Sequence, residues 1–156
     1  MSKTYTQFPE PSMLLPHRAP LLLIDKILNF SNGEWIETET KLNQDLIFFN
    51  GHFPGNPILP GIVIVEMMFQ TCGLYSRLSK SDDTNEASNY GSDRSPEGRA
   101  IKINNLTFQK EVKPGEILKI IAKPKFRVLN FMTFNVEVYS SQNRVSYGEV
   151  ILSMKK

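Results

Sequence analysis

The sequence predicts an α+β fold in which an antiparallel β-sheet wraps around one long central helix. Residues 61–78 are apolar on almost every helical face, which is typical of a buried helix. Two β-rich runs precede this segment and four follow it, and residues 131–140 alternate apolar and polar side chains as a strand with one wet face does. A sheet that curves around the single helix satisfies this order.

Length and composition limit the class of protein. A chain of 156 residues with 40% hydrophobic and 22% charged residues is typical of one globular domain, which we place over residues 1–156. A net charge of +2 without a long basic run argues against a nucleic-acid partner. No run reaches membrane-spanning length and residues 1–12 lack a signal core, so we expect no membrane partner and a cytoplasmic location. The single cysteine, Cys72, is compatible with a reducing compartment.

The chain before the helix is predicted to form a lead-in and a hairpin. Residues 1–12 are polar, contain two prolines and predict a loose lead-in. Residues 21–30 are typical of a buried strand, and the turn Ser31-Asn32-Gly33 predicts a hairpin with a second strand over 34–42. A connection that contains four apolar residues in a row, 46–49, then leads to His52.

The chain after the helix is predicted to form a polar loop and four strands. Residues 79–99 are rich in Ser, Asp, Asn, Glu and Gly, which predicts a mobile loop that cannot bury enough surface to order itself. The strands are expected over residues 101–112, 117–128, 131–140 and 145–154.

The segment that joins the hairpin to the helix carries the candidate chemistry. Residues 52–61 contain three prolines and two glycines, which excludes a helix or a central strand. A rigid loop therefore presents His52 just before the helix, in which Glu66 and Gln70 lie one turn apart on the same face. A carboxylate among apolar side chains is costly unless another group pairs with it or uses it. Together these residues outline an active site.

This stretch resembles a known enzyme family. The pattern Gly-His-Phe-Pro-Gly-x-Pro-x-x-Pro-Gly-x-x-x-x-Glu over residues 51–66 is similar to that of the hot-dog-fold beta-hydroxyacyl-[acyl-carrier-protein] dehydratases of type II fatty acid synthesis. The segment 15–25, which contains Leu-Pro-His-Arg-Ala-Pro, and the Pro-Gly turn at 114–115 extend the resemblance over most of residues 13–155. It implies a hot-dog fold and a dehydratase that converts a (3R)-hydroxyacyl-carrier-protein thioester to the trans-2-enoyl thioester.

The resemblance also implies roles for four residues. His52 and Glu66 correspond to the catalytic pair, Gly61 to the backbone N–H that polarises the thioester carbonyl, and Gln70 to a hydrogen-bond partner near Glu66. The family builds each site across a homodimer, with the histidine from one subunit and the acid from the other, and some members stack three dimers. The implied partner is acyl carrier protein, whose phosphopantetheine carries the substrate, and neither a cofactor nor a metal is expected.

These residue types suit dehydration. A neutral imidazole can take the proton on C2 of the substrate, because its unperturbed pKa is about 6.5. The Gly61 N–H at the helix start, aided by the helix dipole, can stabilise charge on the thioester oxygen. We expect burial in the apolar helix to raise the pKa of Glu66, which would favour its donating a proton to the leaving oxygen, directly or through a water.

Several readings remain open at this point. Met67, Met68 and Phe69 stand where smaller residues are usual, which predicts a narrower or reshaped acyl tunnel and favours a specialised polyene or aryl polyene lipid pathway as the alternative. A hot-dog acyl thioesterase is a further alternative, although thioesterases lack this His-Phe-Pro-Gly loop. We interpret His17 with Arg18 as structural residues that close a turn.

Overall fold

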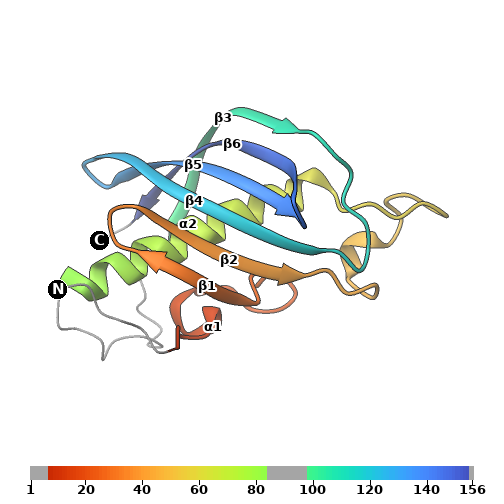
Figure 1. The fold of residues 1–156 in the computed structure, drawn as a ribbon, viewed down its shortest axis with the longest axis horizontal. Coiled ribbons are helices and arrows are strands. Elements are labelled where there is room, and N and C mark those ends of the chain that lie inside the picture. Colours follow the sequence, from red (N-terminus) through yellow and green to blue (C-terminus); the bar gives the residue numbers. More distant parts are fainter. Residues whose placement is uncertain (1–6, 84–97, 155–156) are drawn as a thin grey trace.

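Six strands and one long helix make up most of the described chain (Figure 1). The computed structural model describes residues 7–83 and 98–154, without the side chains of 81–83. The elements in chain order are α1 (Pro11–Leu14), β1 (Lys26–Ser31), β2 (Trp35–Lys41), η1 (Ile47–Phe49, a 3-10 turn), α2 (Gly61–Asp83), β3 (Gly98–Phe108), β4 (Ile117–Val128), β5 (Phe131–Ser140) and β6 (Asn143–Met154). Two strands before the long helix and four after it confirm the predicted order.

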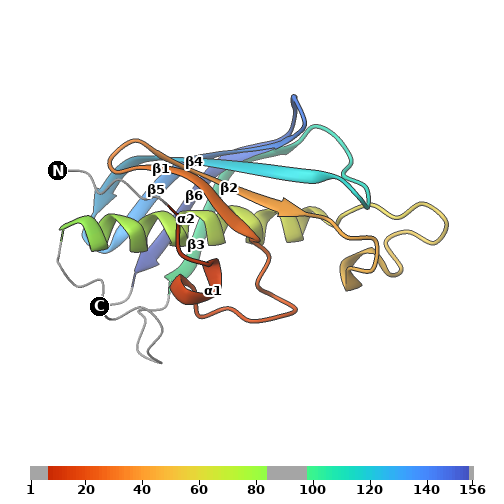
Figure 2. The same ribbon diagram turned by 60° about the horizontal axis from the view of Figure 1, so that its bottom comes forward.

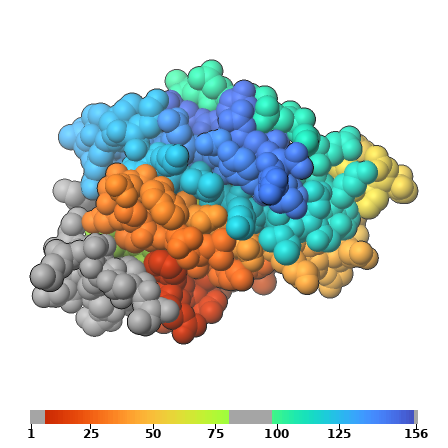
Figure 3. All heavy atoms as spheres, viewed as in Figure 1, coloured from red at the N-terminus to blue at the C-terminus, as the bar shows by residue number. Residues whose placement is uncertain are grey.

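The described strands form one antiparallel sheet. Their order is β1-β2-β4-β5-β6-β3, so β3, which directly follows α2 in the chain, pairs with the last strand, β6. Helix α2 runs along one face of the curved sheet (Figures 1 and 2). In the direction of Figure 1, the atoms of the strands lie in front of most of α2 (Figure 3). This is the predicted architecture of a sheet wrapped around one helix.

The core lies between α2 and the inner face of the sheet. The strands supply one side of this core, because every second residue of a strand points to the inner face of the sheet. The fully buried inward residues of β4 and β5 include Leu118, Ile120, Ala122, Phe134, Val136 and Val138. From the helix, Tyr75 packs edge-on against Phe134, with ring centroids 5.4 Å apart.

Helix α2 is buried along most of its length. Met67, Met68 and Cys72 are at most 1% exposed, as the apolar pattern on all faces predicted. Ile62 in the first turn is an exception among the apolar residues, since 80% of its surface is exposed. The start of the helix therefore presents an uncovered apolar side chain.

Several element boundaries differ from the prediction. Strand β1 begins at Lys26, so residues 21–25 of the strand predicted over 21–30 are not strand, and β3 ends at Phe108, so residues 109–112 of the strand predicted over 101–112 are not strand. Helix α2 continues past residue 78 to Asp83, and β3 begins at Gly98, so the loop predicted over 79–99 is wrong at both ends. A helix that tertiary packing already anchors extends by one hydrogen bond for each added residue, so a polar turn can continue it. Residues 84–97, the rest of the predicted loop, lie outside the described residues, as do 1–6 of the predicted lead-in. Residues 11–14 of that lead-in form α1, which has a proline at its start, where the fixed φ suits a helix.

Strand β3 forms one edge of the sheet beside the start of α2. It is 11 residues long and mostly exposed. Ile101 and Phe108 are 51% and 48% exposed. A long edge strand with exposed apolar residues offers its unpaired backbone groups to another chain.

Candidate active site

His52 lies on a tight loop that precedes α2. The backbone N–H of Ile58 donates to the carbonyl of His52 at 2.8 Å, which closes the loop on itself. Inside this closure, Phe53 and Asn56 exchange two backbone hydrogen bonds of 3.2 and 3.0 Å. These bonds leave the histidine backbone little freedom, as the proline-rich sequence of the loop predicted.

The imidazole of His52 is held in one tautomer. Its Nδ1 lies 3.1 Å from the carbonyl oxygen of Ile58. Because a carbonyl oxygen can only accept, this hydrogen bond requires the proton on Nδ1 and leaves the lone pair on Nε2. The ring also stacks on Phe53, with centroids 4.3 Å apart. One ring nitrogen is thus fixed by the loop, and the other is able to accept a proton.

His52 shares an open groove with the start of α2. The groove has a volume of about 510 Å³, and Gly61, Ile62 and Phe108 are among its lining residues. A Cβ on Gly61 would lie 2.7 Å from Cζ of the Phe108 ring, so the ring packs directly on the glycine backbone. The first N–H groups of a helix have no partner within the helix. The structure therefore brings the predicted base and the predicted N–H donor to one groove.

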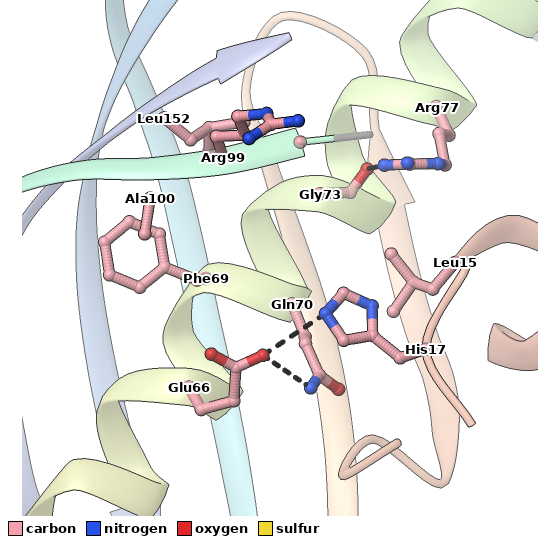
Figure 4. Close-up of a pocket in the computed structure, with 11 residues that line it drawn as sticks. Leu15, His17, Glu66, Phe69, Gln70, Gly73, Arg77, Arg99, Ala100 and Leu152 are labelled. Atoms are coloured by element: carbon pink, nitrogen blue, oxygen red, sulfur yellow. Dashed lines mark hydrogen bonds and ion pairs between the residues drawn. The ribbon is translucent and has the colours of Figure 1, made fainter. Parts of the chain in front are cut away.

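Glu66 lies in a separate, smaller cavity of about 90 Å³ (Figure 4). Its Oε1 accepts a hydrogen bond of 2.9 Å from Nε2 of Gln70 and lies 3.3 Å from Nε2 of His17. Gln70 is itself fixed, since its Nε2 donates to the carbonyl of Leu21 at 2.7 Å and its Oε1 accepts from the N–H of Leu23 at 3.0 Å. The carboxylate is held through one of its two oxygens.

The expectation that burial raises the pKa of Glu66 is wrong. The hydrogen bond from His17 lowers this pKa most, and the hydrogen bond from Gln70 lowers it further. Burial raises the pKa but does not outweigh these donors, because 38% of the side chain is still exposed. Glu66 is therefore ionised at neutral pH in this structure, and the argument for a proton-donating role no longer holds.

The prediction that His17 and Arg18 close a turn is confirmed for Arg18, and His17 has a further contact. Arg18 does close the turn, since its Nη1 donates to the carbonyls of Leu15 and His17 at 2.9 and 2.7 Å. The imidazole of His17, however, points to Glu66 (Figure 4). No spacing relates residue 17 to residue 66 in the sequence. The only available signal was that the Leu-Pro-His-Arg segment lies within the family resemblance.

Within one chain, His52 and Glu66 do not meet. His52 lines the groove at the start of α2, whereas Glu66 lines the cavity with His17 and Gln70. A site that contains both residues needs a second copy, so the predicted sharing of the site between subunits remains a prediction.

The three bulky residues of α2, Met67, Met68 and Phe69, have different surroundings. Met67 and Met68 are buried in the core and line neither the His52 groove nor the Glu66 cavity. Phe69 does line the cavity beside Glu66. Arg77, of which 5% is exposed, lines the same cavity and gives part of its wall a positive charge.

Three other features concern a metal site, a membrane-spanning helix and a nucleophilic cysteine. Across residues 7–83 and 98–154, no three or more His, Cys, Asp or Glu side chains are grouped to hold a metal ion. In the same part of the chain, no helix has the length and apolarity to cross a bilayer. Burial raises the pKa of the Cys72 thiol well above its usual value, which makes it a poor nucleophile.

Sequence comparison finds relatives over most of the chain. The sequence profile of the FabA-like domain matches residues 15–148. The chain is 36% identical over 107 residues to the 3-hydroxyacyl-[acyl-carrier-protein] dehydratase FabZ of Geotalea uraniireducens, which covers 69% of this chain and 68% of that protein. It is 31% identical over 139 residues to the protein of the same name from Xanthomonas euvesicatoria pv. vesicatoria. That alignment covers 88% of this chain and 86% of the Xanthomonas protein.

A solved structure shares the fold. A chain of the dehydratase heterocomplex ApeI:P from Xenorhabdus doucetiae superposes with a TM-score of 0.81, over 96% of this chain and 93% of that one. At 21% sequence identity this likeness concerns the fold alone. It confirms the hot-dog fold that the resemblance implied.

Proposed function

The chain belongs to the family of the FabA-like domain, and from that premise we propose that it is a hydro-lyase that converts a (3R)-hydroxyacyl thioester of acyl carrier protein to the trans-2-enoyl thioester. The observation that carries the proposal is the loop that holds His52 with its Nε2 lone pair available beside the start of α2. The relatives named as 3-hydroxyacyl-[acyl-carrier-protein] dehydratases support the same reaction.

The first step is removal of the C2 proton. Nε2 of His52 accepts it, and the electron pair moves toward the thioester carbonyl. The N–H of Gly61 donates to the carbonyl oxygen as negative charge develops there, aided by the dipole of α2. Loss of a donor of this kind weakens transition-state binding by about 3 kcal/mol in other enzymes.

The second step is loss of the C3 hydroxyl. Oε2 of the ionised Glu66 accepts a hydrogen bond from this hydroxyl and orients it. When the C3–O bond breaks, the electron pair leaves with the oxygen, and the His52 imidazolium returns to that oxygen the proton taken from C2. The products are the enoyl thioester and water, His52 regains its neutral form, and the balance requires neither a cofactor nor a metal.

We place His52 of one copy against Glu66 of a second copy in a homodimer, with a trimer of dimers as the larger form. Beside the His52 groove, Phe53 is 53%, Ile62 80% and Phe108 48% exposed, and Ile101 of β3 is 51% exposed. A second copy that covers these residues would remove apolar surface from water and pair the edge of β3. The reaction is placed in the cytoplasm, where the unpaired Cys72 would remain reduced.

A second candidate is the same reaction in a specialised polyene or aryl polyene pathway. The observation in its favour is the cavity beside Glu66, which Phe69 narrows and Arg77 makes partly polar. A long saturated acyl chain gains most from a wholly apolar wall, whereas a conjugated or polar chain tolerates these two side chains.

The test is incubation of the protein with (3R)-3-hydroxyacyl-carrier protein, using saturated chains of several lengths and one polyenoyl chain. Mass spectrometry of the carrier protein should show the loss of one water, and His52→Ala should abolish it. Release of the free acid without dehydration would instead identify a thioesterase. The preferred chain separates the two candidate pathways.

A further inference from the structure

We propose that His17 is a positioning residue that fixes the Glu66 carboxylate for the substrate, an inference that rests on the proposed dehydratase function. His17 belongs to the turn before β1, whereas Glu66 belongs to α2. The contact between them joins Nε2 of His17 to Oε1 of Glu66 at 3.3 Å (Figure 4).

The two oxygens of Glu66 have different surroundings. Oε1 faces two donors, Nε2 of His17 at 3.3 Å and Nε2 of Gln70 at 2.9 Å. Among the residues that the structure describes, none donates a hydrogen bond to Oε2. The two donors therefore orient the carboxylate so that Oε2 is left for the substrate hydroxyl.

The proton position on His17 follows from its other nitrogen. Nδ1 is buried and has no hydrogen-bond partner among the described residues. A proton on Nδ1 would be a buried donor without an acceptor, which is unfavourable. The proton of the neutral ring therefore lies on Nε2, from which it is donated to Glu66.

Two further charged side chains line the cavity around the pair. Arg77 of α2 and Arg99 of β3 line the same cavity, and no second carboxylate lines it in the described chain. Arg18, next to His17, is turned to backbone carbonyls. The lowered pKa of Glu66, to which the bond from His17 contributes most, agrees with this arrangement.

The first test reads the tautomer of His17 in the unmodified protein. The chain contains two histidines, so the imidazole ¹⁵N spectrum is simple, and the spectrum of His52→Ala assigns the remaining ring. We expect protonated Nε2 and unprotonated Nδ1 for His17 near neutral pH. A ring protonated only on Nδ1 cannot donate to Glu66 and would overturn the proposal.

The second test compares three variants. His17→Phe keeps a ring but removes the donor, His17→Gln keeps an N–H donor, and Arg18→Gln disturbs the same turn without touching Glu66. We expect kcat to fall about tenfold in His17→Phe, to recover in His17→Gln, and to change little in Arg18→Gln, as the loss of one charge-assisted hydrogen bond predicts.

A direct titration separates positioning from a general loss of folding. The ¹³C carboxyl signal of Glu66, assigned with Glu66→Gln, should titrate at higher pH in His17→Phe, while Arg18→Gln should titrate like the wild type. An unchanged Glu66 titration in folded His17→Phe would refute the proposal.

Neither of the spectroscopic readings uses a substrate. If the protein shows no dehydration but the Glu66 carboxyl titrates at higher pH in His17→Phe than in the wild type, the proposed function fails and the positioning contact stands. If dehydration is found and the titrations of His17→Phe and the wild type agree, the positioning role fails and the proposed function stands.

Discussion

At the scale of single residues, the hydrogen-bond donors around Glu66 decide what this carboxylate can do. His17 and Gln70 both meet Oε1, so the side chain is ionised and its second oxygen is the one that can meet a substrate. Hydrogen bonds to the charged form outweigh partial burial here. In the proposed reaction we therefore assign Glu66 the role of an acceptor that orients the substrate hydroxyl.

Glu66→Gln tests this orientation. The amide oxygen of the new side chain must turn to the two donors at the Oε1 position, which leaves its NH₂ group facing the substrate. A donor then stands where an acceptor is needed, and we expect kcat/KM to fall on the order of a hundredfold. Steady-state kinetics on the carrier-bound substrate measure this loss.

Glu137→Gln is the matched control. Glu137 on β5 also has a lowered pKa, chiefly because the hydroxyl of Tyr139 donates to it at 2.8 Å, with Arg144 at 3.1 Å as a second donor. It lines neither the His52 groove nor the Glu66 cavity. We expect Glu137→Gln to keep wild-type activity. A loss as large as that of Glu66→Gln would show that removing an ionised carboxylate lowers activity wherever the carboxylate lies.

The pH dependence of stability follows from the same carboxylate. Its pKa is lowered from the ordinary 4.5 on folding, so its contribution to stability is present above that value and is lost as the pH falls through the folded pKa. His17→Phe should therefore be less stable than the wild type at neutral pH, and the part of this gap due to Glu66 should close in acid. Urea unfolding from pH 7 downward measures the gap. A gap that does not change with pH would show that His17 stabilises only by packing.

The sequence could not reveal the pair formed by His17 and Glu66. Periodicity and spacing relate residues within one element, and they placed Gln70 on the same helical face as Glu66 correctly. Residue 17 reaches Glu66 only because the turn before β1 folds back against α2. Such long-range contacts depend on the complete fold.

At the scale of elements, the first turn of α2 and the end of β3 form one unit. The ring of Phe108 packs on Gly61 so closely that there is no room for a Cβ. The element that provides the N–H donor thus depends on the strand that follows α2 in the chain.

Gly61→Ala tests this contact. The added methyl group would push the Phe108 ring aside or displace the start of the helix, and we expect activity to fall about tenfold, since small displacements of a catalytic donor are costly. Phe108→Leu in the same chain should restore part of the activity by making room. The kinetics of the two single variants and the double variant measure the coupling. Purely additive losses would show that the ring and the glycine do not interact.

The positions of the elements were predictable where periodicity is strong. The strands Ile117–Val128 and Phe131–Ser140 match their predicted bounds, because alternation and turn residues mark both ends. The end of α2 was not predictable, because Ser79 and Lys80 are as compatible with a loop as with a last helical turn. Helix ends depend on packing as well as on propensity.

At the scale of the whole molecule, we propose a site that two chains share. His52 and Glu66 line different cavities in one chain, and apolar side chains beside the His52 groove are exposed. The composition of a single chain contains no signal for the second copy. Only the family resemblance predicted it.

Mixed dimers test the sharing of sites. His52→Ala and Glu66→Gln should each be nearly inactive, whereas a mixed dimer has one site with both wild-type groups. Random exchange makes about half of the dimers mixed with one working site of two, so the mixture should recover about a quarter of wild-type activity, because residues that act as a unit are not additive. Two affinity tags confirm that mixing has occurred. A mixture that stays inactive after confirmed exchange would contradict the shared site.

The order of the strands also affects how the chain folds during synthesis. Strand β6 lies between β5 and β3, although it follows both of them in the chain. Until residues 143–154 have emerged, β3 has no neighbour and the sheet cannot close over α2. The nascent chain therefore carries an apolar helix with an incomplete cover, a state that chaperones bind and that aggregates readily. A chain that stops before Asn143 would keep every residue of the proposed site and would still lack the strand that joins β3 to the sheet.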